Sequence, residues 1–273
     1  MNKINPTPYP ALNEVLSDLV ESIKTTLKDN FIGAYLQGSF ATGGFDEHSD
    51  VDFIVVIEKE IMPDQLEKLQ VMHERIYNLP SYWAQHLEGS YFPKEILWSR
   101  NRRGEKLWYL DNGSRRLVQS DHCNTIVVRW LVREKGVVLA GPPSKTLIEE
   151  IDADALRQDI YNTMHTWGKK ILADPERYYN HFYQTFIVLS YCRMLHDLIY
   201  GINDSKRVGA EWAKWNLGPQ WIGLIDRTWA GRPIPEQSIK RPADPKDFAD
   251  TIKFVEYVMK ESVKYAPKSN IKK

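Results

Sequence analysis

Two aspartates at the start of an apolar segment have the spacing of a metal site. Asp50 and Asp52 lie in the string Ser49-Asp50-Val51-Asp52-Phe53. Alternate side chains on a strand leave the same face, so the two carboxylates can hold a divalent cation between them. Mg²⁺ turns their mutual repulsion into affinity, neutralises phosphate charge and aligns attacking and leaving oxygens. The pair therefore predicts a magnesium site for phosphate chemistry.

A third acid, Glu88, lies in a later segment, residues 85–90, that we expect to be part of a strand. A neighbouring strand would bring this carboxylate beside the two aspartates. There it would be a third metal ligand, a general base that accepts the proton of an attacking hydroxyl, or both.

A glycine and a serine precede the aspartates. Gly38-Ser39 directly follows a short apolar segment. Glycine lets the backbone approach a phosphate, and a serine that opens a helical turn offers its hydroxyl and unpaired N–H groups to an anion. Taken alone, the Ser-Asp-x-Asp string also fits a turn followed by a solvent-facing strand. The whole pattern, from Gly38 through Asp52 to Glu88, favours the phosphate site.

The spacing of apolar residues predicts the elements that position these groups. The first half of the chain should form an α/β (α+β) domain, a small mixed sheet with helices packed on it, and we make no assignment for residues 95–117. We expect helices at residues 12–27, 63–78 and 121–133, the last capped by Asp121, and strands at residues 31–36, 51–57, 83–91 and 136–140.

The second half is helical almost throughout. The turn residues Gly141-Pro142-Pro143 place a domain boundary near residue 150, giving a first domain of residues 1–150 and an all-α helical bundle of residues 151–273. The expected helices are residues 155–173, 180–200, 206–215, 219–229 and 246–265.

Composition narrows the partners and the compartment. The 36 basic residues balance the 36 acidic ones, so no overall field gathers a polyanion; a small-molecule partner is favoured and nucleic acid is unlikely. Residues 1–10 carry no secretion signal, and no stretch has the roughly 18 apolar residues of a membrane span. The two cysteines form no metal or disulfide motif. We expect a cytoplasmic protein with no membrane partner.

Other side chains of catalytic type receive structural interpretations. His122-Cys123, beside Asp121, is interpreted as a helix start and not as half of a zinc site. His48 is interpreted as a turn residue because Mg²⁺ prefers oxygen ligands. No Walker loop, nucleophile elbow or dinucleotide fingerprint is present.

At this point the sequence resembles a known family. Gly38-Ser39 followed by residues 49–53 is similar to the signature of the polymerase-beta-like nucleotidyltransferases, and the second half is similar to that of the streptomycin/spectinomycin adenylyltransferases, notably at residues 189–193, Gly201, Lys206 and residues 211–213. In that family the two domains enclose ATP and an aminocyclitol drug. The resemblance implies a nucleotidyltransferase catalytic domain and a helical domain that clamps substrate and nucleotide. It also implies an enzyme that moves AMP from Mg·ATP to a hydroxyl of an aminoglycoside or aminocyclitol antibiotic, releasing pyrophosphate.

The same resemblance assigns roles to single residues. It implies that Asp50, Asp52 and Glu88 bind Mg²⁺, with Glu88 also the base. The nucleotide-binding residues that it implies are Gly38, Ser39, Ser49, Arg193 and Lys206, the last two reaching phosphates from the helical domain.

The acceptor is left open. Drug-binding members of the family place acids early in the long second-domain helix, where this chain has Tyr179 and Tyr183. Candidate acids that could replace that charge are Glu176, Asp197, Glu105 and Asp111. The candidate aromatic rings for a cation–π contact with the drug are Trp98 and Trp108. The alternatives are a nucleotidyltransferase that acts on a metabolite, a protein side chain or an RNA end, and a non-catalytic nucleotide-binding module.

Overall fold

The computed structural model describes residues 5–232 and 239–267 of the chain. The chain divides into two compact units, Met1–Ile151 and Asp152–Lys273, and each is described by itself. No helix in the described ranges combines the length and apolar composition that crossing a bilayer requires.

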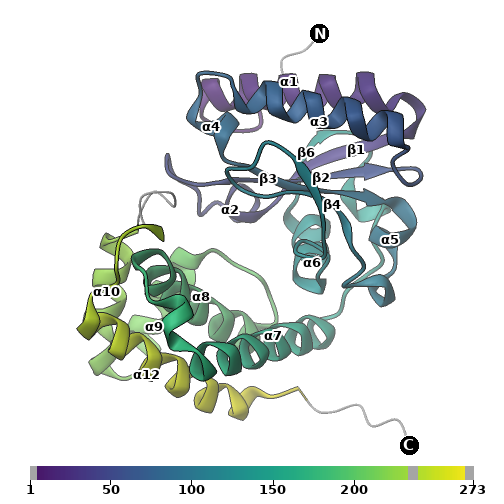
Figure 1. The fold of residues 1–273 in the computed structure, drawn as a ribbon. Helices are drawn as coiled ribbons and strands as arrows, with labels where there is room; N and C mark the ends of the chain where they lie inside the picture. Colours follow the sequence, from purple (N-terminus) through teal and green to yellow (C-terminus); the bar gives the residue numbers. More distant parts are fainter. Residues whose placement is uncertain (1–4, 233–238, 268–273) are drawn as a thin grey trace, which may run out of the picture. The chain divides into compact units, whose positions relative to one another are not determined.

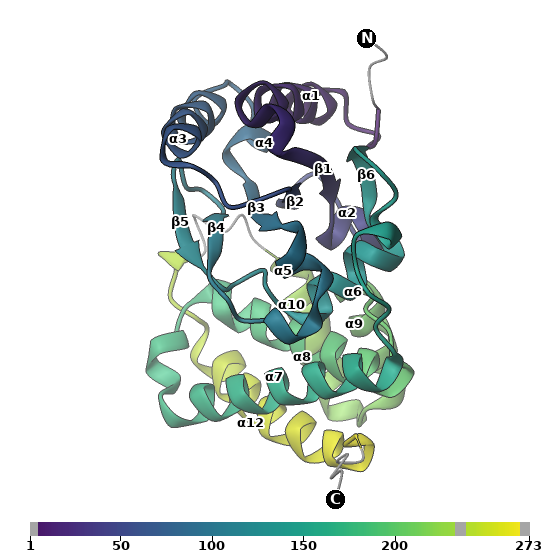
Figure 2. The same ribbon diagram turned by 90° about the vertical axis from the view of Figure 1, so that its right-hand side faces the viewer.

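The first unit is built on one mixed sheet, as the sequence predicted (Figures 1 and 2). Its strand order is β5-β4-β3-β2-β1-β6. Only β2 and β3 are paired in parallel, and every other neighbouring pair is antiparallel. The strands are β1 Phe31–Leu36, β2 Val51–Ile57, β3 Leu87–Pro93, β4 Leu107–Leu110, β5 Leu117–Ser120 and β6 Val137–Ala140.

Two long helices cover one face of this sheet. α1 (Pro10–Leu27) and α3 (Pro63–Tyr77) lie side by side over it in both views (Figures 1 and 2). α3 is the crossover that a parallel pair such as β2 and β3 requires. Arg75 of α3 pairs with Asp18 of α1 at 2.6 Å, and this hydrogen-bonded pair lowers the pKa of the carboxyl group. The apolar faces of α1 and α3 pack against the sheet and form one hydrophobic core with it.

Alternation along β2 and β3 decides what the other face of the sheet carries. Val51, Phe53 and Val55 belong to the core beneath α1 and α3. Successive side chains of a strand point to opposite faces, so Asp52 is turned away from that core. Leu87 and Tyr91 of β3 also belong to the core, which turns Glu88 to the same face as Asp52. Burial of the apolar residues thus fixes the orientation of the acids.

Short helices complete the unit, and two of them correct the sequence prediction. Residues 83–85, predicted as strand, belong to the helix α4, because the ring of Trp83 packs against Tyr9 and Phe40. The helix predicted from Asp121 begins at Ile126, where the Thr125 side chain caps it by accepting the Val128 N–H. The remaining elements are α2 Gly38–Thr42, α4 Tyr82–Gln85, α5 Lys94–Trp98, α6 Ile126–Lys135 and the 3-10 turns Lys28–Asn30, Arg100–Arg102 and Ser144–Thr146.

The second unit is helical, as predicted. α8 is buried along most of its length and contacts each of the other long helices of the unit, which explains its nearly continuous apolar sequence. Gly209 of α9 lies so close to α8 that a Cβ there would be 2.5 Å from the Arg193 Cα. The helices are α7 Ala153–Ala173, α8 His181–Tyr200, α9 Lys206–Asn216, α10 Ile222–Ala230 and α12 Pro245–Ser262, with 3-10 turns at Pro175–Tyr178, Pro219–Trp221 and Val263–Tyr265.

One titratable side chain of the first unit is enclosed between α3 and the sheet. His73 is buried, and its Nε2 lies 2.8 Å from the hydroxyl oxygen of Tyr91 on β3. Burial disfavours the charged imidazolium and lowers the pKa of His73 to about 3. The folded protein therefore holds this histidine neutral in the pH range where an unfolded chain protonates it.

We expect His73 to make the protein sensitive to mild acid. Because its folded pKa lies below the unfolded value of about 6.5, the unfolded state binds the extra proton between these values, and stability falls as pH falls through that window. The arithmetic gives a loss of about 2 kcal/mol between pH 7 and pH 5. Urea unfolding at both pH values measures it, and His73→Gln should remove this part of the pH dependence. A variant with the full wild-type dependence would contradict the assignment.

Candidate active site

The three acids predicted from the sequence come together on the sheet. Asp52 on β2 is paired directly with Glu88 on the parallel strand β3, and Asp50 lies just before β2. One carboxylate oxygen of each residue lies within 4.8 Å of the others, and all three side chains are half-buried. The structure thus has the geometry that the sequence predicted, while the chemical role of each acid stays a prediction.

Such a cluster suits a hard divalent cation. Three carboxylates this close repel one another, most strongly where burial keeps water away. Mg²⁺ prefers oxygen ligands and is bound by one or two carboxylates together with phosphate oxygens and water. The donor set of Asp50, Asp52 and Glu88 fits that preference, since it offers oxygen alone and leaves room for a phosphate group.

The turn at Gly38 lies directly against Asp52. Gly38 has φ +58°, and a Cβ at this position would lie 1.8 Å from the Asp52 Oδ2. A side chain here would strain the backbone and displace the carboxylate. The Gly38 main chain therefore passes beside the acid cluster. Its predicted contact with a phosphate stays a prediction.

Ser39 follows in the first turn of α2, and its hydroxyl is unsatisfied. Its Oγ is buried and forms no hydrogen bond with any residue in the described ranges. A buried hydroxyl without a partner costs free energy, so such groups are generally explained by a missing ligand or water. Ser39 is thus available to donate to a bound anion.

Ser49, by contrast, is occupied within its own turn. Its Oγ accepts the Asp46 N–H at 2.9 Å and donates to Asp46 Oδ1 at 3.3 Å. The hydroxyl therefore closes the turn that leads into Asp50. Its predicted contact with a triphosphate stays a prediction.

Glu88 has two neighbours that the sequence analysis missed. The Tyr109 hydroxyl on β4 lies 2.8 Å from Glu88 Oε1, and His122 Nε2 lies 3.3 Å from the same oxygen. Tyr109 also lies 2.9 Å from Asp111 Oδ1. His122 was interpreted only as part of a helix start, and residues 95–117 had no assignment. Tyr109 and Asp111 are two residues apart, so on a strand they share one face. The sequence alone did not show that this face lies beside Glu88, because that depends on the register of β4 with β3.

The surroundings of Tyr109 and His122 raise the pKa of both side chains. Burial, reinforced by the Glu88 carboxylate, raises the pKa of Tyr109 well above its usual value, so the phenol stays protonated. The hydrogen bond to Glu88 raises the pKa of His122. Burial also raises the pKa of the Cys123 thiol, which is therefore a neutral buried group and not a nucleophile.

The predicted phosphate-binding cations lie on neighbouring helices of the second unit. Arg193 is on α8, and its Nε is buried without a hydrogen-bond partner in the described ranges. Lys206 is the first residue of α9, which Ser205 caps by accepting the Val208 N–H. Lys206 Nζ lies 4.3 Å from the ring centroid of Phe186. The unsatisfied guanidinium N–H of Arg193 is available to donate to a ligand, and its contact with a phosphate stays a prediction.

The residues considered as substitutes for a drug-binding acid have other partners. Asp197 is buried at the end of α8 and accepts hydrogen bonds from Asn203 and from the Asp204 N–H. Glu105 is paired with Arg102 at 2.7 Å. Asp111 contacts Tyr109, Trp108 packs on the core, and Glu176 and Trp98 are exposed. Tyr179 and Tyr183 contact the aromatic rings of Phe248 and Tyr178, respectively.

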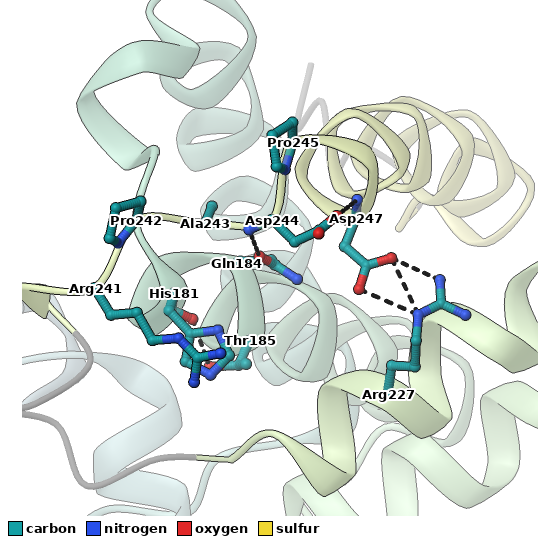
Figure 3. Close-up of a pocket in the computed structure, with 10 residues that line it drawn as sticks. All are labelled: His181, Gln184, Thr185, Arg227, Arg241, Pro242, Ala243, Asp244, Pro245 and Asp247. Carbon is teal, nitrogen blue, oxygen red and sulfur yellow. Dashed lines mark hydrogen bonds and ion pairs between the residues drawn. The ribbon is translucent and has the colours of Figure 1, made fainter.

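A separate pocket of about 370 Å³ lies within the helical unit (Figure 3). It contains no member of the acid trio. Its carboxylates are already used: Asp247 pairs with Arg227 at 2.7 Å, and Asp244 caps α12 by accepting the Asp247 N–H. The amide oxygen of Gln184 accepts the Asp244 N–H, which ties the loop before α12 to α8. These contacts give the residues that line the pocket a structural role, and we assign the pocket no chemical step.

Both halves of the chain match known protein families. Residues 21–82 match the family model described as "Polymerase beta, Nucleotidyltransferase", and residues 146–261 match "Aminoglycoside adenylyltransferase, C-terminal domain". Spectinomycin 9-adenylyltransferases of two Staphylococcus aureus strains, Mu50 and N315, are 25% identical over 218 residues, covering 75% of this chain and 78% of theirs. A crystal structure of a spectinomycin adenyltransferase from Enterococcus faecialis with ATP and spectinomycin has the same fold, with a TM-score of 0.66 at 15% identity over 90% of this chain and 98% of that one.

The family models and the relatives define an enzyme of the nucleotidyltransferase class. The two models match in order along this chain, so its two parts are similar to the two domains of the aminoglycoside adenylyltransferases.

Proposed function

We propose that this enzyme transfers AMP from Mg·ATP to a hydroxyl of an aminocyclitol or aminoglycoside antibiotic and releases pyrophosphate. The observation that carries the proposal is the convergence of Asp50, Asp52 and Glu88 within 4.8 Å on adjacent strands. The similarity of the chain to the aminoglycoside adenylyltransferases supports the reaction, and the names of its relatives support the acceptor class.

The three acids have distinct roles in this proposal. Asp50 and Asp52 would hold Mg²⁺, with Glu88 as a third ligand, and the metal would neutralise charge on the phosphates during transfer. Glu88 would also accept the proton of the acceptor hydroxyl as that oxygen forms its bond to the α-phosphorus. The bond from the α-phosphorus to the pyrophosphate oxygen breaks in line with the attack.

The remaining site residues would position the nucleotide. The main chain at Gly38 and the unsatisfied Ser39 hydroxyl are suited to a phosphate, because both lie in the turn that contacts Asp52. We assign Ser49 a part in the same phosphate contact, through the turn that it closes. Arg193 and Lys206 would supply positive charge to the phosphates, the first as a planar fork and the second as a point charge.

Among drugs, we favour an acceptor with few positive charges. Tyr179 and Tyr183 stand where drug-binding members of the family have acids, and an aromatic ring attracts a cation less strongly than a carboxylate does. Spectinomycin is therefore the first acceptor to test, as the names of the relatives also suggest. A metabolite or protein acceptor would need the same acid trio, so only the acceptor assay separates these possibilities.

We expect pyrophosphate release when the enzyme is given ATP, Mg²⁺ and spectinomycin. The assay should include streptomycin and a set of aminoglycosides, with mass spectrometry of the drug to detect added AMP. Asp52→Asn is the control, because it removes a proposed metal ligand and should abolish AMP transfer while the same acceptors are supplied. If no drug in the set receives AMP and another acceptor does, the antibiotic assignment is wrong. The nucleotidyltransferase class would not be affected by that result.

A further inference from the structure

The Glu88 side chain on β3 contacts side chains from other parts of the first unit. In the part of the chain that the structure describes, the Tyr109 hydroxyl lies 2.8 Å from Glu88 Oε1 and His122 Nε2 lies 3.3 Å from the same oxygen, and both can donate to it. An oxygen that accepts from two donors has little freedom to rotate. The other oxygen, Oε2, is then the one that can be turned toward the metal or the acceptor hydroxyl.

The register of the sheet explains why Tyr109 is in this position. β4 runs antiparallel to β3 and pairs Tyr109 with Ser90. Residues two apart on a strand share a face, so Tyr109 is the diagonal neighbour of Glu88 on the face that carries the acids. The ring of His122 lies 5.3 Å from the ring of Tyr109. The three side chains thus form one contact group at the end of β4.

The same register creates a problem that Tyr109 solves. Continuing the β3–β4 pairing by one residue sets Asp111 opposite Glu88, and like charges placed opposite each other repel. The Tyr109 hydroxyl lies between them, 2.8 Å from Glu88 Oε1 and 2.9 Å from Asp111 Oδ1. A phenol has one proton, so it can donate fully to only one carboxylate at a time. Without this hydroxyl, the two carboxylates would face each other unscreened.

We propose that Tyr109 and His122 are positioning residues that hold Glu88 through Oε1, and that Tyr109 also separates Glu88 from Asp111. This inference rests on the proposed role of Glu88. It assigns the two residues no proton transfer and no contact with substrate. Their effect is to keep the carboxylate oriented toward Asp50 and Asp52.

Tyr109→Phe tests the proposal by removing only the hydroxyl. Residues that orient a metal ligand typically contribute 10- to 100-fold to metal affinity or activity, so we expect a loss of about that size in Mn²⁺ affinity with ATP present and in kcat with spectinomycin. The KM for spectinomycin should change little. Free Mn²⁺ measured by electron paramagnetic resonance gives the binding without an acceptor. Tyr35→Phe is the matched control, since this buried tyrosine of the same sheet donates its hydroxyl to the Pro142 carbonyl.

Two further comparisons separate positioning from a general loss of structure. Tyr109→Phe/Asp111→Asn should regain part of the lost kcat, because the facing negative charge is gone. His122→Ala should weaken Mn²⁺ binding severalfold and His122→Gln should restore it, since the amide keeps a donor; this exposed side chain is a safe change if Tyr109→Phe does not fold. Wild-type Mn²⁺ affinity and kcat in both Tyr109→Phe and His122→Ala would overturn the proposal. Wild-type behaviour of Glu88→Gln would instead overturn the role of Glu88.

Discussion

Replacing Glu88 by glutamine should lower kcat for AMP transfer by about 10²- to 10⁴-fold, the usual contribution of a general base. Glutamine has nearly the same shape but accepts no proton and carries no charge. Glu88 is paired with Asp52 and its side chain is 13% exposed, so bulk water cannot easily replace it. Pyrophosphate release at saturating ATP and acceptor measures the loss. Glu95→Gln, at an acid of the same unit that is 79% exposed, is the matched control and should keep wild-type kcat.

A magnesium titration of the same variant separates the two roles left open for Glu88. If the carboxylate acts mainly as a metal ligand, excess Mg²⁺ should restore much of kcat, because the weakened site fills again. If it acts mainly as the base, kcat should stay low at saturating Mg²⁺. Our expectation is the second result. A Glu88→Gln enzyme with wild-type kcat and wild-type magnesium dependence would remove Glu88 from the mechanism.

The parts of the fold and site that could be predicted from the sequence are those that depend on local pattern. β1 and β2 were predicted with their observed limits, because uninterrupted apolar runs mark strands covered on both faces. Asp50, Asp52 and the Gly38 turn were found for a similar reason, since their chemistry depends on near neighbours in the chain. Glu88 required one further assumption, that its strand lies next to β2, and the structure bears that placement out.

The parts that escaped prediction depend on contacts distant in sequence. Trp83 looks like a strand residue, yet its packing on Tyr9 and Phe40 holds it in a helical turn. Arg129 of α6 received no interpretation from the sequence, and the structure shows it fully buried and donating to the Ile96 and Leu97 carbonyls. Tyr109 and His122 reach Glu88 only through the β3–β4 register and a loop that returns to it. No periodicity within one segment contains that information.

The last prediction concerns a residue with no side chain. Gly38→Ala should lower kcat by about 10²-fold or more, because the new Cβ would fall 1.8 Å from the Asp52 Oδ2 and must displace that carboxylate. The backbone, at φ +58°, adds a stability loss of about 1–2 kcal/mol for a residue with a Cβ. Gly43→Ala separates the two effects. Gly43 ends α2 at φ +72°, and a Cβ added there would meet nothing within 4 Å, so this variant should lose similar stability but keep most of its activity. Thermal unfolding and kcat measured on both variants decide the matter: equal activity losses would mean that backbone strain, and not the position of Asp52, is what Gly38 protects.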